Sequence, residues 1–266
     1  MLEIFLICLA FGCFSGVLAG LFGLGGGVVL VPFFLIMLDT HGVANDLLML
    51  MAVATSLATI IVTSIAATTM QHRLGAVIWK YVFNLSFGII IGVIIGAFVA
   101  DSLASENMRL IFALYLLYVA VQMAIQSKLE ARLKPLSVSV LRASGLGIGF
   151  ASSVLGIGGG TLTVPLLAKH QMPMRNAVAI SSACGLPIAI IGTITYAVLG
   201  WQKTGLPEGS VGYVYLPAFA GIVMSSMLTA PLGAKLANKL PTRRLKRYFS
   251  LLLFAVAGKL LWVIFI

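Results

Sequence analysis

Two glycine-rich breaks interrupt the apolar runs of this 266-residue chain and carry its clearest chemical signal. The first reads LFGLGGGVVLVPFF from Leu21, and the second reads VLGIGGGTLTVPLL from Val154. Glycine tolerates the positive φ angles of a sharp turn and lets a ligand approach the backbone. A helix that starts after such a turn has N–H groups without intrahelical partners and the positive end of its dipole, which together suit an anion. The predicted anion-binding residues are Gly25, Gly26, Gly27 and Val28 in the first break and Gly158, Gly159, Gly160 and Thr161 in the second.

Hydroxyl residues follow each break on a similar segment, AVATS in the first half of the chain and AVAIS in the second. These hydroxyls can donate hydrogen bonds to a bound oxyanion, or they can bond to their own helix or to a neighbouring one. Both interpretations stay open for the four residues concerned, which are Thr55, Ser56, Ser181 and Ser182.

The two breaks differ in the side chains that follow the glycines. The second carries Thr161 and Thr163 where the first has Val28 and Leu30, so we expect an asymmetric site. Glycine also lets helices pack closely, and this alternative explains the spaced glycines elsewhere in the chain, Gly88, Gly92 and Gly96. A run of three glycines that recurs together with a following Val-Pro favours the anion site.

The composition is that of an integral membrane protein. Hydrophobic residues make up 61% of the chain and charged residues 9%, and the mean hydropathy is +1.12. A soluble domain carries roughly 25% charged residues. The net charge of +10 comes from bases in short loops, without the basic stripe and interleaved aromatics of a nucleic-acid-binding surface. We therefore interpret these bases as orientation signals in a lipid bilayer and expect no nucleic-acid partner.

Machinery for catalysis is missing from the sequence. There is no His-Glu-x-x-His motif and no arrangement typical of a Ser-His-Asp triad. The three cysteines lie in apolar runs and form no Cys-x-x-Cys pair. No pair of acids lies within the apolar runs, which weakens a proton-pump interpretation. We predict no catalytic residues, no metal site and no cofactor.

The apolar stretches form two similar halves. A membrane span needs about 20 apolar residues, so the short stretches 28–38 and 161–168 do not cross alone. The order of glycine break, Val-Pro and hydroxyl segment recurs along the chain. We predict a first membrane repeat over residues 1–130, a cytoplasmic linker over 131–137 and a second repeat over 138–266. The predicted apolar stretches are 4–22, 28–38, 47–70, 77–100, 108–125, 138–155, 161–168, 177–199, 211–234 and 248–266.

The distribution of bases decides between two topologies. If each broken segment crosses the membrane once, the seventeen Lys and Arg residues divide almost evenly between the two sides. If each is instead a hairpin that enters and returns, all of them except Arg109, Lys203 and Lys259 lie on one side. The positive-inside rule favours the hairpins. We therefore predict an all-α integral membrane protein with two inverted repeats, each a glycine-broken re-entrant helix hairpin plus three transmembrane helices, and with both termini outside.

The stretches GLFGLGGGVVLVPFF and SSVLGIGGGTLTVPLL, each followed by the AVATS or AVAIS segment, resemble the two halves of TauE/SafE-type sulfite and organosulfonate exporters. The resemblance covers nearly the whole chain. It implies export of small sulfur oxyanions, either sulfite or sulfonates such as sulfoacetate. The residues that match the doubled motif are Gly25, Gly26, Gly27, Gly158, Gly159 and Gly160, with Thr55, Ser56, Ser181 and Ser182 as further matches.

We interpret the chain as a secondary transporter of the inner membrane that works by alternating access. Its predicted partners are a small anionic substrate and the lipid bilayer. The alternatives are an anion channel, a transporter of another small solute such as a metal cation, and a membrane assembly partner. The sequence leaves the oligomeric state open, a homo-oligomer included.

Overall fold

The computed structural model describes residues 2–22, 26–125, 137–170, 172–237, 253–258 and 260, and this part of the chain is almost entirely helical. The helices are α1 (Leu2–Phe22), α2 (Gly27–Thr40), α3 (Asn45–Arg73), α4 (Trp79–Ser102), α5 (Ser105–Ile125), α6 (Val138–Leu155), α7 (Gly160–Lys169), α8 (Met174–Leu199) and α9 (Leu216–Ala237). Two strands of two residues each, β1 (Ser210–Val211) and β2 (Val214–Tyr215), form the only sheet of the described residues. Within the same residues, α1, α3, α4, α6, α8 and α9 are long and apolar enough to cross a membrane. The predicted all-α membrane protein is confirmed.

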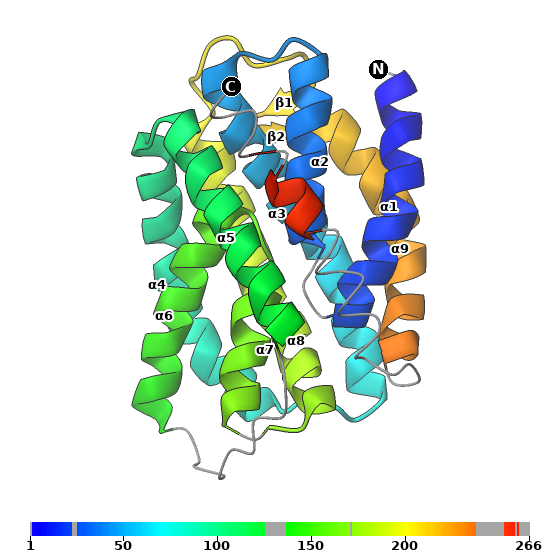
Figure 1. The fold of residues 1–266 in the computed structure, drawn as a ribbon, viewed down its shortest axis with the longest axis vertical. Coiled ribbons are helices and arrows are strands. Elements are labelled where there is room, and N and C mark those ends of the chain that lie inside the picture. Colours follow the sequence, from blue (N-terminus) through cyan, green and yellow to red (C-terminus); the bar gives the residue numbers. More distant parts are fainter. Residues whose placement is uncertain are drawn as a thin grey trace.

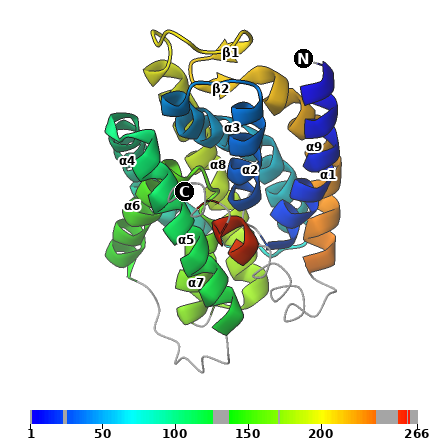
Figure 2. The same ribbon diagram turned by 45° about the horizontal axis from the view of Figure 1, so that its top comes forward.

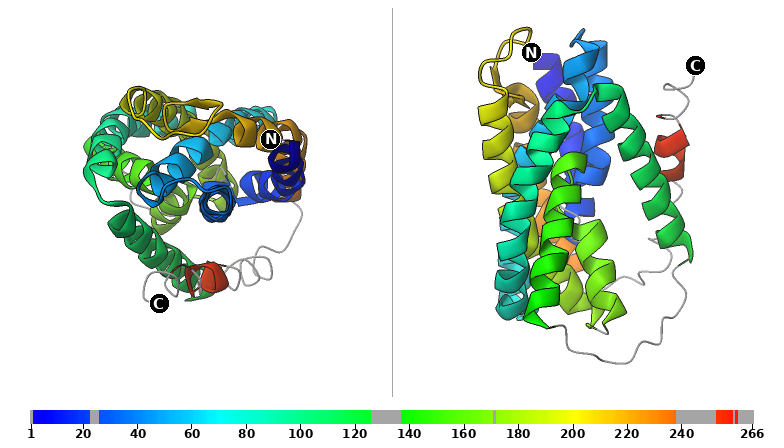
Figure 3. Two further views of the ribbon diagram at one scale, coloured as in Figure 1. Left: turned by 90° about the horizontal axis from the view of Figure 1, so that it is seen from above. Right: turned by 90° about the vertical axis from the view of Figure 1, so that its left-hand side faces the viewer.

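Three helix pairs organise the fold: α1–α9 and α4–α6 are parallel, and α3–α8 is antiparallel. The helices α3 and α8 lie between the pair α1 and α9 on one side and the pair α4 and α6 on the other (Figures 1 and 3). The central helix α3 is the most enclosed of the membrane-length helices, with 83% of its apolar window buried. Each outer pair joins a helix of the first half of the chain to one of the second half. The two halves are therefore interlocked and do not form separate bodies.

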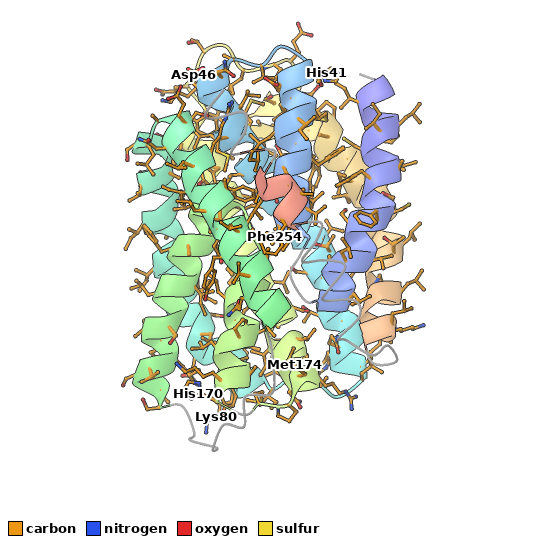
Figure 4. All side chains as sticks on the ribbon, in the orientation of Figure 1. His41, Asp46, Lys80, His170, Met174 and Phe254 are labelled. Atoms are coloured by element: carbon orange, nitrogen blue, oxygen red, sulfur yellow. The ribbon has the colours of Figure 1, made fainter. Side chains whose placement is uncertain are left out.

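Each glycine break lies at the inner end of a pair of consecutive helices. Figure 1 shows α1 running inward from the end of the molecule marked N, and α2 returning to that end, where Figure 4 places His41. The second pair opens to the opposite end, because α7 ends there at His170 and α8 begins there at Met174 (Figure 4). The predicted linker lies almost wholly outside the described residues, as does most of the last predicted apolar stretch, 248–266.

Close backbone contact holds the outer pairs together, as predicted for the spaced glycines. A Cβ added to Gly92 of α4 would clash with the carbonyl oxygen of Leu146 and lie 2.8 Å from the amide nitrogen of Phe150, both on α6. Gly88 and Gly96 face the same helix in the same way. Small residues at such crossings let helices approach closely, which is the main source of helix association in lipid. The packing interpretation of these three glycines is confirmed.

The glycines of this crossing allow a matched stability test. Gly92→Ala places a methyl group against the backbone of α6 and should cost about 1–3 kcal/mol through overpacking. Gly147→Ala adds the same methyl to α6 where nothing lies within 4 Å, so helix propensity should leave stability unchanged or slightly raised. Thermal melting of the purified proteins in detergent measures both. Equal melting temperatures for the two variants would contradict the close crossing of α4 and α6.

One predicted apolar stretch, 211–234, begins differently from the sequence expectation. Residues 210–215 form the β1–β2 hairpin, and α9 starts only at Leu216 (Figure 2). The positive φ of Gly209 (85°) and Gly212 (55°) turns the chain here, and a helix cannot form through such residues. Tyr213 is buried and donates a hydrogen bond of 2.6 Å to Oδ1 of Asp101. Burial and this bond raise the pKa of Tyr213, so its hydroxyl keeps its proton.

The outward faces of the outer helices are apolar. Large side chains of α4, among them Phe83, Phe87 and Phe98, are exposed, and so are Met227 and Leu228 of α9. A soluble monomer rarely exposes contiguous apolar area of this kind, whereas lipid tails cover it without cost. The exposed faces of α4 and α9 are therefore suited to face the bilayer.

Candidate functional site

Two left-handed glycines form the turns that start the short helices. Gly26 (φ 83°) precedes α2 and Gly159 (φ 71°) precedes α7, so the helices begin one residue before the predicted starts at Val28 and Thr161. A left-handed residue followed by helical residues turns successive N–H groups to one side and makes an anion-binding concavity. The first N–H groups of each helix also lack intrahelical acceptors. Gly25 lies outside the described residues, so this geometry is seen from Gly26 onward in the first break.

The two glycine turns meet inside the protein. A Cβ added to Gly27 would clash with the carbonyl oxygen of Gly156 and lie 2.8 Å from Cα of Ile157. No side chain larger than hydrogen fits between these two backbones. Gly156 itself has a positive φ of 66° and ends α6. The beginning of α2 and the turn that leads to α7 therefore form one buried unit, which we call the paired turns (residues 26–27 and 156–161).

The central helices hold the second of the paired turns. Ser56 of α3 donates a hydrogen bond of 2.8 Å to the carbonyl oxygen of Gly156. From α8, Gly185 approaches the carbonyl oxygen of Gly158, and Ile188 lies 2.5 Å from the Cβ position of Gly159. Contacts from two long buried helices fix this turn without a charged side chain. Ser56, one of the predicted site residues, therefore bonds to the backbone of the turn.

Two buried hydroxyls beside the second turn lack hydrogen-bond partners. Ser152 and Thr163 are fully buried, and neither side-chain oxygen has a partner in the structure. The hydroxyl of Ser152 lies 3.4 Å from the Cβ position of Gly159, next to the side chains of Ile188 and Ile148. An unsatisfied buried hydroxyl costs about 1–3 kcal/mol, and native proteins keep few of them. The two hydroxyls are therefore candidates for binding a ligand held against α7.

The first turn has no such polar surroundings. Ala19 stands where the second half has Ser152, and the Cβ position of Gly26 is 3.5 Å from Ala19 and 3.4 Å from Leu30. Val28 and Leu30 are buried. The polar groups of the paired turns therefore gather at the second turn, in keeping with the asymmetry expected from Thr161 and Thr163.

Helix α5 supplies a residue that the sequence did not indicate. The hydroxyl of Tyr115 is hydrogen-bonded to the hydroxyl of Thr161, the predicted residue at the start of α7. Tyr115 lies in an apolar run far from either glycine break, and no local motif marks it. A signal was available for Ser152, because Ser152 and Ser153 directly precede the second break.

The remaining predicted hydroxyls are distributed around the paired turns. Thr55 accepts a hydrogen bond of 3.0 Å from the backbone N–H of Tyr215, so it joins α3 to the β1–β2 hairpin. Ser182 donates to the carbonyl oxygen of Val178 at 3.0 Å, within its own helix. Ser181 is buried one turn of α8 before Gly185, which contacts the second turn. Thr55 and Ser182 therefore bond to backbone groups of the protein, which was the alternative to ligand binding.

An apolar pocket lies away from the paired turns. Its volume is about 470 Å³, and residues of α1, α2, α3 and α5 line it together with residues 256 and 260. Phe11 and Phe33 stack on each other in its wall, with ring centroids 3.9 Å apart. No residue of the paired turns lines this pocket. Among the described residues, no three His, Cys, Asp or Glu side chains lie close enough to hold a metal ion.

Comparison with known proteins identifies relatives over almost the full chain. Residues 8–260 match the family described as "Sulfite exporter TauE/SafE". The chain is 40% identical over 261 residues to a "Probable membrane transporter protein" of Haemophilus influenzae, covering 97% of this chain and 98% of the relative. It is 27% identical over 253 residues to a protein of the same description in Methanocaldococcus jannaschii, covering 93% and 90%. No solved structure matches the chain.

The apolar helices, the helix breaks at depth and these relatives together define a multi-pass membrane transporter. Irregular backbone is tolerated within a membrane only inside protein or beside a water-filled cavity, and the paired turns are buried in this way. The chain belongs to the sulfite exporter TauE/SafE family.

Proposed function

We propose that this protein is a secondary transporter, and not an enzyme, that exports a small sulfur-containing oxyanion across the inner membrane by alternating access. Sulfite and organosulfonates such as sulfoacetate are the proposed substrates. The family description supports the sulfur chemistry. The proposal that the substrate is an anion rests on the second turn, where α7 starts and where the buried hydroxyls of Ser152 and Thr163 have no hydrogen-bond partner.

The chemistry of the second turn suits an oxyanion of this size. Hydroxyl and backbone N–H groups donate hydrogen bonds, and bonds to an ionised acceptor are roughly twice as strong as neutral ones. No lysine or arginine side chain is needed, so the site binds without the desolvation cost of a buried cation. A site of neutral donors can also release its ligand, which transport requires. We propose that Gly158, Gly159, Gly160 and Thr161 bind the anion through backbone and hydroxyl groups, and that Gly25, Gly26, Gly27 and Val28 form its apolar counterpart.

We further propose that the two hairpins re-enter the membrane from opposite faces as parts of inverted repeats. The α1–α2 pair opens to the end that carries His41 and Asp46, and the α6–α7 pair opens to the end that carries Lys80 and His170 (Figure 4). Short loops rich in Lys and Arg face the cytoplasm. The second end is then cytoplasmic, the linker lies inside, and both termini lie outside. A rearrangement of the helices around the paired turns would expose the site to each side in turn.

Counterflow in proteoliposomes tests this function. We expect vesicles preloaded with sulfite to take up labelled sulfite faster than empty vesicles, with uptake that saturates as the sulfite concentration rises. A carrier reorients faster with substrate bound than without it, so substrate inside the vesicles accelerates uptake. A channel shows no such acceleration. Protein-free liposomes are the control, and taurine, sulfoacetate, sulfate and chloride are the competitors.

The outcomes of this experiment separate the alternatives. Unsaturable flux that preloading does not accelerate would favour the anion channel. Flux of a cation with no effect of sulfite would contradict the proposed substrate class. Competition by sulfoacetate but not by sulfate would identify a sulfonate as the substrate.

A further inference from the structure

A second group of unpartnered polar atoms lies on α3, beyond the residues considered so far. Thr68 and Gln71 are 6% and 1% exposed, and neither Oγ1 of Thr68 nor Oε1 of Gln71 has a hydrogen-bond partner. Both residues belong to the most enclosed of the membrane-length helices. A buried polar atom without a partner is costly, and in a membrane protein such residues mark paths for water or solute. Thr68 and Gln71 therefore carry polar atoms whose hydrogen-bonding capacity is not used in this structure.

The two residues share a face of α3 with the second turn. Ser64, Thr68 and Gln71 are spaced four and three residues apart, so their side chains lie one above another along the helix. The hydroxyl of Ser64 is 2.6 Å from the Cβ position of Gly185 on α8. That same position of Gly185 is 3.4 Å from the carbonyl oxygen of Gly158. The polar face of α3 thus starts at the second turn and continues for two helical turns toward the end of the helix.

Helix α8 runs antiparallel to α3 along this face. The contact of Ser64 with Gly185 fixes one end of the pairing. At the other end, the guanidinium of Arg175 donates a hydrogen bond to the carbonyl oxygen of Leu74. The two contacts have the same register, because ten residues separate them on each helix. The same register places Thr68 at the level of Ser181. A predicted hydroxyl of α8 and an unpartnered hydroxyl of α3 therefore share one depth between the two helices.

Two arginines lie at the end of this face. Arg73 occupies the last turn of α3, next to His72, and Arg175 lies in the first turn of α8. Nδ2 of Asn176 donates to the carbonyl oxygen of Ala76 at 2.8 Å, so the start of α8 is bonded to the turn after α3. These contacts close the α3–α8 face at the proposed cytoplasmic end. Basic residues at the mouth of a path raise the local concentration of an anion.

We propose that the face between α3 and α8 is the cytoplasmic half of the transport path, and that Thr68 and Gln71 form a transient subsite there for the same oxyanion. This proposal rests on the proposed function. The hydroxyl of Thr68 donates directly. The side-chain amide of Gln71 donates once its NH₂ group faces the path, because the two ends of an amide exchange places by a half-turn. The cations hold the anion at the mouth, the neutral subsite receives it, and the second turn binds it.

Thr68→Val and Gln71→Glu test the subsite in the reconstituted protein. Valine keeps the shape of threonine without the hydroxyl, and glutamate keeps the shape of glutamine but repels an anion. We expect sulfite counterflow to fall at least about 10-fold in each variant, the change that corresponds to one lost interaction of about 1.4 kcal/mol. Thr68→Ser should keep most of the flux. The stabilisation of the detergent-purified protein by sulfite in a thermal melt should stay unchanged, because the second turn is intact.

Thr195→Val is the matched control on α8. Its hydroxyl donates to the carbonyl oxygen of Ile191 at 2.8 Å within its own helix, so its loss should not alter flux. If Thr68→Val does not reach the membrane, Thr68→Ala takes its place. Normal flux in Thr68→Val and Gln71→Glu would overturn the subsite, and so would a loss of flux that Thr68→Ser does not restore. Absence of sulfite stabilisation in the unmodified protein would instead contradict the proposed function.

Discussion

Gly159→Ala is expected to reduce sulfite transport at least about 100-fold while the protein still reaches the membrane. The added methyl group would lie 2.5 Å from Cδ1 of Ile188, 3.3 Å from Cγ2 of Ile148 and 3.4 Å from the hydroxyl of Ser152, so the start of α7 has to shift away from the proposed anion position. Each hydrogen bond to a charged group contributes about 1.5–3 kcal/mol, so excluding the anion from Ser152 and the adjacent N–H groups has a large effect. Counterflow in proteoliposomes, normalised to the amount of protein inserted, measures it.

Gly26→Ala measures the effect of backbone strain alone at a left-handed glycine. Gly26 has the same left-handed conformation, so alanine meets the same backbone strain of order 1 kcal/mol or more. Its Cβ position has only ordinary contacts, the nearest 3.4 Å away, and it lies at the apolar first turn. We expect this variant to lose less than about 10-fold in flux, since backbone strain does not remove ligand contacts. Equal losses in the two variants would mean that turn geometry, and not anion contact at the second turn, limits transport.

The double variant Ser152→Ala, Thr163→Val is expected to lose transport without losing stability. Neither hydroxyl has a partner in the structure, so its removal breaks no hydrogen bond of the ligand-free protein. Replacing an unsatisfied buried polar group by an apolar one is neutral or stabilising. The melting temperature without ligand should therefore stay the same or rise. Sulfite affinity and flux should fall by about 100-fold or more, because two charge-assisted hydrogen bonds are lost.

A serine with a bonded hydroxyl provides the comparison for this double variant. Ser225 of α9 is buried, and its hydroxyl bonds to the carbonyl oxygens of Gly221 and Ile222 in its own helix. Ser225→Ala should leave sulfite affinity unchanged. If the double variant is destabilised and its sulfite affinity is normal, then Ser152 and Thr163 have a structural role and the ligand binds elsewhere.

The sequence predicted the helix breaks well because their signals are local. Three successive glycines and a Val-Pro pair indicate where a turn ends and a helix begins, and the observed starts at Gly27 and Gly160 lie within one residue of the prediction. The asymmetry of the two breaks was also visible, because Thr161 replaces Val28. Composition alone was sufficient for the class of fold, since few charges and many apolar residues suit only a bilayer.

The partners of the predicted residues could not be read from the sequence. Ser56 bonds to Gly156, which lies a hundred residues further along the chain, and this contact depends on how α3 crosses the second turn. Tyr115 bonds to Thr161, which lies 46 residues further along the chain. The β1–β2 hairpin was missed because its apolar residues resemble the start of a helix. Sequence periodicity reports which face is buried and not which atoms meet there.

The most direct test of the anion site is thermal melting of the detergent-purified protein against sulfite, sulfoacetate, taurine, sulfate and acetate, with chloride as the ionic-strength control. A ligand at 100 times its dissociation constant stabilises a protein by roughly 2.7 kcal/mol. We predict stabilisation by sulfite or a sulfonate, none by chloride, and loss of the effect in the Ser152→Ala, Thr163→Val variant. Stabilisation that persists in this variant, or a response to chloride equal to that of sulfite, would contradict an oxyanion site at the second turn.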